Sequence, residues 1–272
     1  MVQNPETAMP AVSLLPATFE RVVDSLRAAI NALSADTVEP NLGLPVIARE
    51  TIERVGYVKN FPQLLGTVHT FRGDTTAWAC LRGEAVPGGR WHRDQQPTDV
   101  VLTPAACYHV YPEFENCSLD APAIRAVESF CFRHEATREM GRLQSFRMLE
   151  FVFLGRPSEA LAWRDAWLER VADWLRRGGL DVRVDAANDP FFGPGAKLMG
   201  NAQRDRQLKW EIVAEVADGI RQAVASGNYH VEHFGETFGI DAAGAPAHSA
   251  CMAFGLERLA LAVMHAGIAP GW

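Results

Sequence analysis

Arginines, glutamates and aromatic residues are concentrated in one short stretch of the chain, residues 131–151. The stretch holds four arginines and three glutamates between apolar residues. Guanidinium groups bind phosphate through paired hydrogen bonds, a carboxylate can accept from an exocyclic amine, and an aromatic ring can stack on a nucleobase. These are the residue types of a nucleotide site. A solvated surface hairpin with ion pairs would have the same composition.

The alternation of side chains in this stretch predicts a two-stranded hairpin with a polar, glycine-containing connection. Side chains repeat every two residues in a strand, so Arg133 and Glu135 share one face of the first strand. Phe146, Met148 and Glu150 share one face of the second. If the two faces coincide, a guanidinium, two carboxylates and a ring surround one spot.

A second motif near the C-terminus connects this hairpin with a known family. The segments FRHE (132–135) and RLQSF (142–146) are followed, more than a hundred residues later, by GLER (255–258). In this order the segments resemble the second and third motifs of class II aminoacyl-tRNA synthetases, F-R-x-E, R-x-x-x-F and G-Φ-(G/E)-R. Each motif is weak alone, and the pair in this order is fairly specific.

Two cysteines and a glutamate narrow the resemblance. Cys107, Glu150 and Cys251 are similar to the zinc-binding set of methanogen-type seryl-tRNA synthetases, and residues 60–266 resemble their shortened bacterial relatives, the amino acid:[carrier protein] ligases. The resemblance implies one zinc ion per subunit, with an open position for the amine of an amino acid. His109 and His248 lie near the two cysteines in the sequence and are rival ligands.

The resemblance also implies roles for the motif residues. Arg133 would hold the α-phosphate and the substrate carboxylate, and it is the proposed catalytic residue. Glu135 would accept from the adenine amine, and Arg142 would clamp the γ-phosphate. Phe146 would stack under adenine, while Arg258 would cover its other face and touch the γ-phosphate.

The same family uses Mg²⁺ to bridge the phosphates of ATP. Glu211, Glu232 and Asn228 are candidates for holding this ion, and the sequence does not choose among them.

Composition limits the alternatives. The chain has 272 residues, 48% of them hydrophobic, and a formal net charge of −7 without a long basic run, so an extended RNA-binding surface is disfavoured. No apolar run approaches the roughly 18–20 residues of a membrane helix. Five cysteines and no recognisable export signal suit a reducing, cytoplasmic location. Outside the proposed zinc set, we expect Cys80, Cys117 and Cys131 to be inert buried thiols.

The elements that must position these residues predict an α+β fold, a class II synthetase-like antiparallel sheet flanked by helices. We expect an N-terminal helical segment (1–60) before a catalytic domain (61–272). The pattern predicts helices at 18–34, 158–177 and 251–266, strands at 181–185 and 228–234, strands and turns over 66–115, and either state at 208–216.

The predicted 158–177 helix begins at a Ser158 cap and buries a stripe that includes Leu161. Arg164, Arg170, Arg176 and Arg177 lie opposite that stripe, either as a solvated face or as a docking rim for an acidic carrier protein.

These observations predict an ATP-dependent, AMP-forming ligase. It would activate a small amino acid, glycine before alanine, and load it on the phosphopantetheine thiol of a holo carrier protein, as a cytoplasmic homodimer without membrane contact. One alternative is a seryl-like tRNA aminoacylating enzyme, which the acidic charge disfavours. Another is a catalytically inactive regulatory paralogue, which retention of the three motif arginines disfavours.

Overall fold

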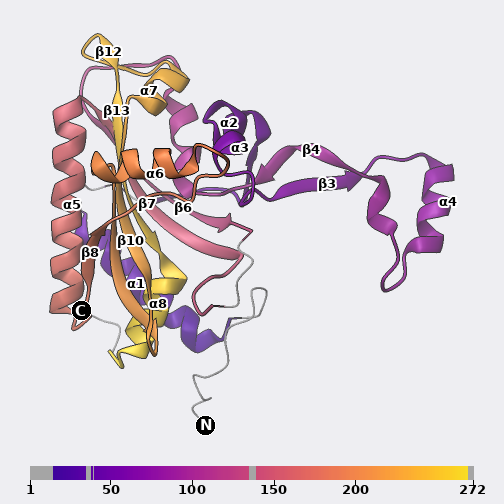
Figure 1. The fold of residues 1–272 in the computed structure, drawn as a ribbon, viewed down its shortest axis with the longest axis horizontal. Coiled ribbons are helices and arrows are strands. Elements are labelled where there is room, and N and C mark those ends of the chain that lie inside the picture. The colour runs from indigo at the N-terminus through magenta and orange to yellow at the C-terminus, as the bar shows by residue number, and fades with distance from the viewer. Residues whose placement is uncertain (1–14, 35–37, 39, 135–138, 269–272) are drawn as a thin grey trace.

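The structure is a computed structural model that describes residues 15–34, 38, 40–134 and 139–268. A seven-stranded sheet with the order β1-β6-β7-β13-β10-β9-β8 forms its centre (Figure 1). Only β1 runs parallel to its neighbour, and every other adjacent pair is antiparallel. The predicted α+β fold with an antiparallel sheet is confirmed. The strands are β1 (Pro40–Leu42), β6 (Ala123–Phe132), β7 (Ser145–Gly155), β8 (Arg183–Ala186), β9 (Lys209–Ala217), β10 (Ile220–Val231) and β13 (His248–Gly255).

Three long helices cover one face of this sheet. They are α1 (Ala17–Leu33), α5 (Pro157–Arg177) and α8 (Leu256–His265). Their apolar stripes share one core with inward-facing strand residues such as Leu149, Phe151 and Phe254. The helix predicted over 18–34 is confirmed, and it packs in the same core as the sheet.

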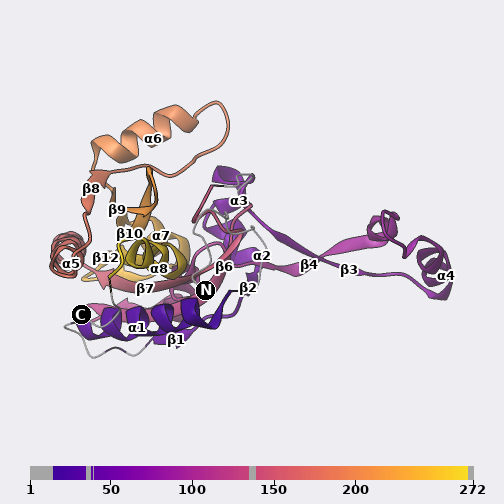
Figure 2. The ribbon, with the colours of Figure 1, turned by 90° about the horizontal axis from the view of Figure 1, so that it is seen from below.

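The opposite face of the sheet carries short helices and a second core. These are α2 (Arg49–Arg54), α3 (Tyr57–Asn60), α7 (His233–Phe238) and the 3-10 helices η2 (Ala106–His109) and η3 (Tyr111–Phe114). In β7, Val152 and Leu154 join this core, whereas Leu149 and Phe151 face the long helices. Glu150 therefore points to the side of the short helices. Helix α6 (Ala196–Asp205) lies across the sheet from α1 (Figure 2).

A long arm projects from this body. It consists of the strands β3 (Thr67–Phe71) and β4 (Gln95–Leu102), the helix α4 (Thr75–Glu84) and the 3-10 helix η1 (Trp91–Asp94), as Figure 1 shows. β2 (Val46–Ala48) pairs with β4 at the base of the arm. A small third sheet contains β5 (Ser118–Leu119), β11 (Asp241–Ala242) and β12 (Ala245–Pro246).

The helix in this arm corrects the expectation of only strands and turns over 66–115. Asp74 caps α4 by accepting hydrogen bonds from the amides of Thr76 (3.0 Å) and Ala77 (2.9 Å). No residue of α4 is buried. A helix without a buried stripe leaves no 3.6-residue hydrophobic period in the sequence.

Helix α5 exists as predicted, but its cap and its buried face differ. Arg156 occupies the N-cap and Pro157 the first turn, so the Ser158 cap was wrong. Leu161 is 39% exposed, whereas Arg164 is buried and donates to the Gln207 carbonyl at 2.8 Å. Leu161 therefore does not belong to the buried stripe, and the predicted exposed row of arginines lacks Arg164.

Two further segments switch from strand to helix where one element was expected. Residues 251–255 belong to β13, and α8 begins only at Leu256, so the single helix predicted over 251–266 was wrong in its first part. Likewise β10 ends at Val231, before α7 begins at His233. Fully buried strands are apolar on both faces, so their sequences do not differ from those of buried helices. The ambiguous segment at 208–216 lies in β9.

A buried glycine in α7 supplies a test of this packing. A Cβ atom at Gly235 in α7 would lie 2.2 Å from the Ala247 carbonyl oxygen, whereas a Cβ at Gly83 in α4 would meet nothing within 4 Å. We expect Gly235→Ala to lower the free energy of unfolding by about 1–3 kcal/mol or more, through steric overlap. Gly83→Ala should raise it by about 0.5–1 kcal/mol, through helix propensity. Urea denaturation measures both, and equal stabilities of the two variants would contradict the packing of α7 on β13.

Candidate functional site

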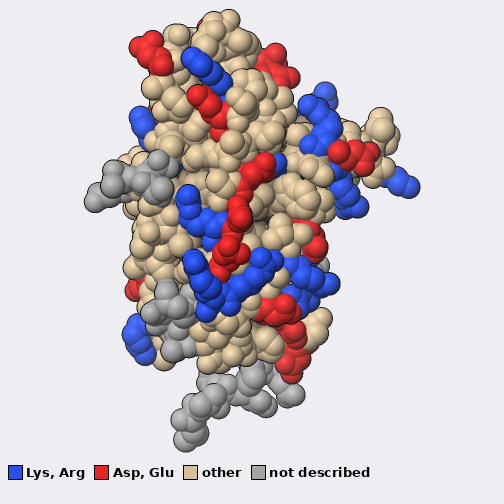
Figure 3. Space-filling view, turned by 90° about the vertical axis from the view of Figure 1, so that its left-hand side faces the viewer, with Lys and Arg blue, Asp and Glu red and all other residues tan. Residues whose placement is uncertain are grey.

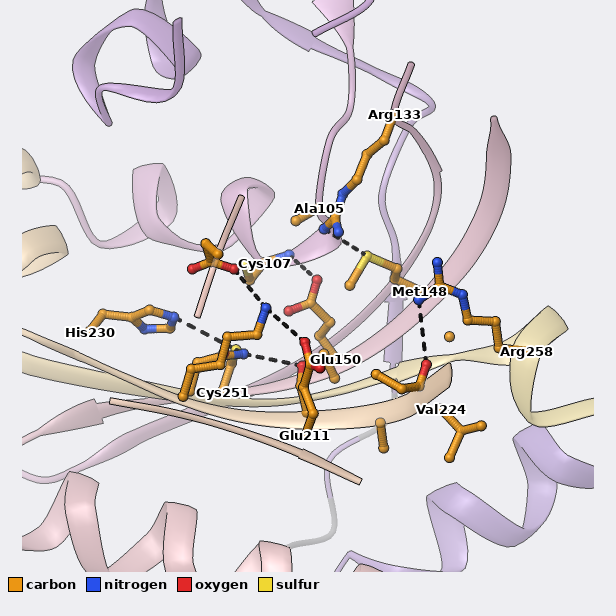
Figure 4. A pocket seen from close by; sticks show the side chains of 18 of the residues that line it. Ala105, Cys107, Arg133, Met148, Glu150, Glu211, Val224, His230, Cys251 and Arg258 are labelled. Carbon is orange, nitrogen blue, oxygen red and sulfur yellow. Dashed lines mark hydrogen bonds and ion pairs between the residues drawn. The ribbon is translucent and has the colours of Figure 1, made fainter. Parts of the chain in front are cut away.

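A pocket opens on the sheet face opposite the long helices. Side chains from β7, β9, β10 and β13, from η2 and from the residue that follows β6 line it (Figure 4). β6 and β7 form the hairpin predicted from the alternation, with Cys131 opposite Phe146 and Val127 opposite Glu150. The register places Phe146, Met148 and Glu150 on the pocket face of β7.

The two thiols and the carboxylate of the predicted metal set lie together in this pocket. Cys107 belongs to η2, Glu150 to the middle of β7, and Cys251 to β13, where it pairs with Val152. One ligand atom from each lies within 4.8 Å of the other two, and all three side chains are buried. Residues separated by more than a hundred positions thus converge because η2 packs over the β7–β13 pair.

The surroundings of these groups shift their proton affinities. Burial raises the pKa of the Glu150 carboxyl to about 8, even though the Cys107 amide donates to it at 3.1 Å. A hydrogen bond from the Cys107 thiol lowers the pKa of Cys251 and raises that of Cys107. The Asn228 amide nitrogen also lies 3.2 Å from Cys251 Sγ. Glu150 and Cys107 thus retain their protons in this buried site, and a bound cation would favour the deprotonated form of all three groups.

The donor chemistry fits zinc. Zinc accepts thiolate and carboxylate ligands tetrahedrally, so three protein ligands leave one position for a further group. The rival histidines lie elsewhere: His109 Nε2 is 3.0 Å from the Leu44 carbonyl oxygen, and His248 Nε2 is 3.7 Å from a Glu232 carboxylate oxygen. His230 was missed by the sequence analysis, and its Nε2 lies 3.8 Å from Cys251 Sγ.

Two of the remaining cysteines correct the sequence analysis. Cys80 and Cys117 are exposed, whereas Cys131 is buried as expected. Cys80 belongs to the arm helix and Cys117 to the turn before β5, so neither lies in a core.

The proposed nucleotide end of the pocket is lined by three of the residues assigned to the nucleotide. They are Arg133, Phe146 and Arg258. The Arg133 guanidinium carbon lies 5.5 Å from the centroid of the Phe146 ring, and its Nε donates to the Pro104 carbonyl at 3.0 Å. Arg258, in the first turn of α8, donates to the Gly141 carbonyl at 2.8 Å. Figure 4 shows Met148 between Arg133 and Arg258, with the Arg133 guanidinium reaching toward Cys107.

The other two assigned residues are not part of this wall. Glu135 lies outside the described residues, so its role stays a prediction. Arg142 does not line the pocket, and its guanidinium forms an ion pair with Glu139. Its neighbour Gly141 does line the pocket, which places the Arg142 backbone at the rim.

The magnesium candidates separate into two groups. Glu211 and Asn228 line the pocket, and Glu232 lies outside it, near His248. Carboxylate and amide oxygens are suitable ligands for Mg²⁺. The structure thus leaves Glu211 and Asn228 as the candidates within reach of a ligand in the pocket.

A lysine that the sequence analysis missed also lines the pocket. Lys209 Nζ lies 2.7 Å from Asp189 Oδ1 and 3.1 Å from Glu211 Oε1. Burial alone would lower the pKa of Lys209, but Asp189 and Glu211 raise it above its ordinary value, which keeps the ammonium charged. The segment around Lys209 gave no clear strand or helix pattern, so its direction toward the pocket had no signal in the sequence.

Comparison with known proteins identifies close relatives. No protein-family model matches the chain. Amino acid--[acyl-carrier-protein] ligase 2 of Bradyrhizobium diazoefficiens is 41% identical over 267 residues, which cover 96% of this chain and 79% of the relative. Ligase 1 of the same organism is 40% identical over 92% of this chain and 78% of the relative. The type-2 serine--tRNA ligase of Methanocaldococcus jannaschii is 27% identical over 58% of this chain and 32% of its own length.

Solved structures with low identity share the fold. The Methanopyrus kandleri seryl-tRNA synthetase, solved with Aquifex aeolicus tRNASec, superposes with a TM-score of 0.77 at 20% identity over 96% of this chain and 54% of that chain. The Pyrococcus horikoshii seryl-tRNA synthetase, solved with ATP, gives a TM-score of 0.65 at 17% identity over 93% of this chain and 52% of that chain. This chain thus spans about half the length of these synthetases. From its close relatives, and as its motifs predicted, the chain belongs to the amino acid--[acyl-carrier-protein] ligase family.

Proposed function

We propose that this protein activates a small amino acid with ATP and transfers it to the phosphopantetheine thiol of a carrier protein. The observation that carries the proposal is that Arg133, Phe146 and Arg258 line the same pocket as the Cys–Glu–Cys set. Two relatives about 40% identical are named amino acid--[acyl-carrier-protein] ligases, which supports a carrier protein as acceptor.

In the first step, a carboxylate oxygen of the amino acid attacks the α-phosphorus of ATP, and pyrophosphate leaves. Negative charge increases on the α-phosphate oxygens as the new bond forms. Arg133 is held by the Pro104 carbonyl and the Phe146 ring, so its guanidinium is oriented before the substrate binds. A preorganised cation stabilises the transition state without reorganisation during the reaction. Mg²⁺ would enter with ATP, and Glu211 and Asn228, which line the pocket, would be its ligands.

The Cys–Glu–Cys set would hold zinc and, through it, the substrate amine. A bound zinc ion would supply a Lewis-acidic position that selects substrates with a free α-amino group. Two aromatic rings line the pocket with this set, the half-buried Tyr108 and the buried Phe234, with 6.0 Å between their centroids. Bulky rings near the proposed position of the amine leave room only for short substrate side chains. This supports glycine as the first substrate and alanine as the second.

In the second step, the phosphopantetheine sulfur attacks the carbonyl carbon of the aminoacyl-adenylate. The bond between that carbon and the phosphate oxygen breaks, AMP leaves, and an aminoacyl thioester forms. The AMP phosphate can accept the proton of the thiol. The mixed anhydride is already activated, so positioning of the two reactants supplies much of the rate.

A homodimer is proposed on the exposed edge of the sheet. β1 is the last strand on its side, and Leu42 is 81% exposed, Leu44 63% and Phe130 50%. Unpaired strand edges with exposed apolar side chains promote association. A second copy of the chain covering this edge would bury them.

No helix in the described ranges is both long and apolar enough to cross a membrane.

The charges on the face that carries α5 do not support the predicted docking of an acidic carrier protein on that helix. Figure 3 shows basic and acidic side chains interleaved on this face. Arg176, for example, lies 3.6 Å from Asp173 of the same helix. Interleaved charges produce little long-range attraction for an acidic partner.

Removing one thiol tests the metal set. We expect the wild-type protein to carry about one zinc ion per protomer and Cys251→Ala to lose most of it, because a two-ligand site binds zinc weakly. Cys131→Ala removes an equally buried thiol outside the set and should keep the zinc. Metal analysis of the dialysed proteins measures this. Equal zinc content in both variants would contradict the assignment.

Removing one guanidinium tests the nucleotide end. We expect Arg258→Ala to slow amino acid-dependent pyrophosphate exchange by about a hundredfold, the typical effect of deleting a charge-stabilising group. Arg221→Ala, which breaks an exposed pair with Asp181 at 2.9 Å, should change it by less than about twofold. An Arg258→Ala protein with the wild-type exchange rate would show that ATP binds elsewhere.

The acceptor and the amino acid are tested together. Incubation with ATP, glycine, alanine or serine, and either holo carrier protein or tRNA, should yield glycyl and alanyl thioesters and leave tRNA uncharged. Mass spectrometry of the carrier protein and acid precipitation of the tRNA are the measurements. Charged tRNA would favour the synthetase alternative, and faster pyrophosphate exchange with serine would overturn the preference for small side chains. Exchange with none of them would indicate the inactive paralogue.

A further inference from the structure

A buried ion cluster lies directly behind the proposed nucleotide end of the pocket. Arg147 on β7 is 7% exposed, and Glu257 in the first turn of α8 is 2% exposed. Arg147 Nε donates to Glu257 Oε1 at 2.7 Å, and its two terminal nitrogens donate to the Glu20 carboxylate of α1 at 2.7 and 2.8 Å. Arg147 and Glu20 do not line the pocket, whereas Glu257 borders it.

Glu257 holds the backbone of Arg147 as well as its side chain. The β7–β13 ladder ends with Met148 opposite Gly255. The Arg147 amide lies beyond that end, and it donates to Glu257 Oε2 at 2.7 Å. The carboxylate thus continues the ladder by one hydrogen bond after β13 has turned into α8. An acidic side chain is also favourable in the first turn of a helix.

The pair joins the two sides of the proposed nucleotide clamp. Arg147 follows Phe146 on β7, and because side chains alternate, Phe146 faces the pocket while Arg147 faces the long helices. Glu257 precedes Arg258, whose side chain lines the pocket from α8. The hydrogen bonds between Arg147 and Glu257 therefore fix the strand that carries the ring relative to the helix that carries the guanidinium.

We infer that Arg147 and Glu257 are positioning residues that set the separation between Phe146 and Arg258 for a nucleotide base. The inference rests on the proposed function, because it assumes that these two side chains contact the nucleotide. Glu20 supports the pair from behind, and it touches neither the strand amide nor the pocket.

A second ion pair between α1 and the sheet provides the matched control. Arg27 of α1 donates to the Glu128 carboxylate of β6 at 2.6 and 2.8 Å. The side chain of Glu128 is 13% exposed, and it does not line the pocket. Glu128→Gln thus weakens a two-bond contact between a helix and the sheet without touching the clamp.

The experiment measures nucleotide binding directly, by isothermal titration of the full chain with ATP and with AMP. In Glu257→Gln, the side chain has one acceptor oxygen in place of two, so it can no longer accept from both the backbone amide and the guanidinium of Arg147. We expect this variant to bind both nucleotides about tenfold or more weakly. Breaking a buried, hydrogen-bonded charge pair displaces the strand and the helix that the pair joins. Glu128→Gln should change both dissociation constants by less than about twofold, even if the two variants lose similar thermal stability. Zinc content should be unchanged in both.

A second variant, at a residue that does not line the pocket, keeps the inference testable if Glu257→Gln does not fold or acts on the nucleotide directly. Arg147→Lys retains the charge but loses the planar guanidinium that donates to two carboxylates at once. It should therefore also lower the affinity for ATP and AMP. Wild-type affinity in the folded variants, or an equal loss in Glu128→Gln, would overturn the inference alone. A wild-type protein that binds neither nucleotide would overturn the proposed function, and the inference with it.

Discussion

The site is organised around one constraint, the proximity of three acidic groups in a buried, solvent-excluded position. Cys107, Glu150 and Cys251 lie within 4.8 Å of one another, and all three are buried. As anions they repel each other, and as neutral groups they keep protons that burial alone makes hard to remove, as the raised pKa of Glu150 shows. A divalent cation resolves both difficulties, because it binds the deprotonated groups and compensates their charge. The amino acid would then be selected by its amine, and the neighbouring aromatic rings would limit its size.

Strand β7 carries Glu150 of this set and Phe146 of the proposed nucleotide end on one face, and its opposite face packs in the core. Along β7, Phe146, Met148 and Glu150 face the pocket, whereas Leu149 and Phe151 face the core under α1, α5 and α8. The burial of this core fixes the register, and a slip of one residue would turn every functional side chain away from the pocket. The same geometry explains why the ion cluster behind the pocket matters. It couples the end of β7 to the start of α8, where the antiparallel ladder no longer does so.

Local patterns predicted much of this arrangement, and the failures have physical causes. The hairpin containing residues 131–151 followed from alternation, and the convergence of the three metal-set residues was expected only from the family resemblance. The sequence analysis assigned no role to Arg147 or Glu257, because an ion pair between residues 110 positions apart leaves no periodicity in a single sequence. Lys209 was missed because the segment 208–216 gave no clear strand or helix pattern. The arm helix α4 was missed because none of its residues is buried, and the boundary between β13 and α8 was missed because the buried strand and the apolar side of the helix form one continuous apolar pattern.

Cobalt substitution tests the central claim, a metal that binds two thiolates and grips an amine, most directly. Cobalt(II) occupies zinc sites with similar ligands and, unlike zinc, absorbs visible light, with intense near-ultraviolet bands when thiolates are bound. The account predicts that the cobalt protein shows these thiolate bands and that its visible spectrum changes on addition of glycine. Acetate, which has the carboxylate of glycine but no amine, should leave the spectrum unchanged. A spectrum without thiolate bands, or one that responds equally to glycine and acetate, would contradict it.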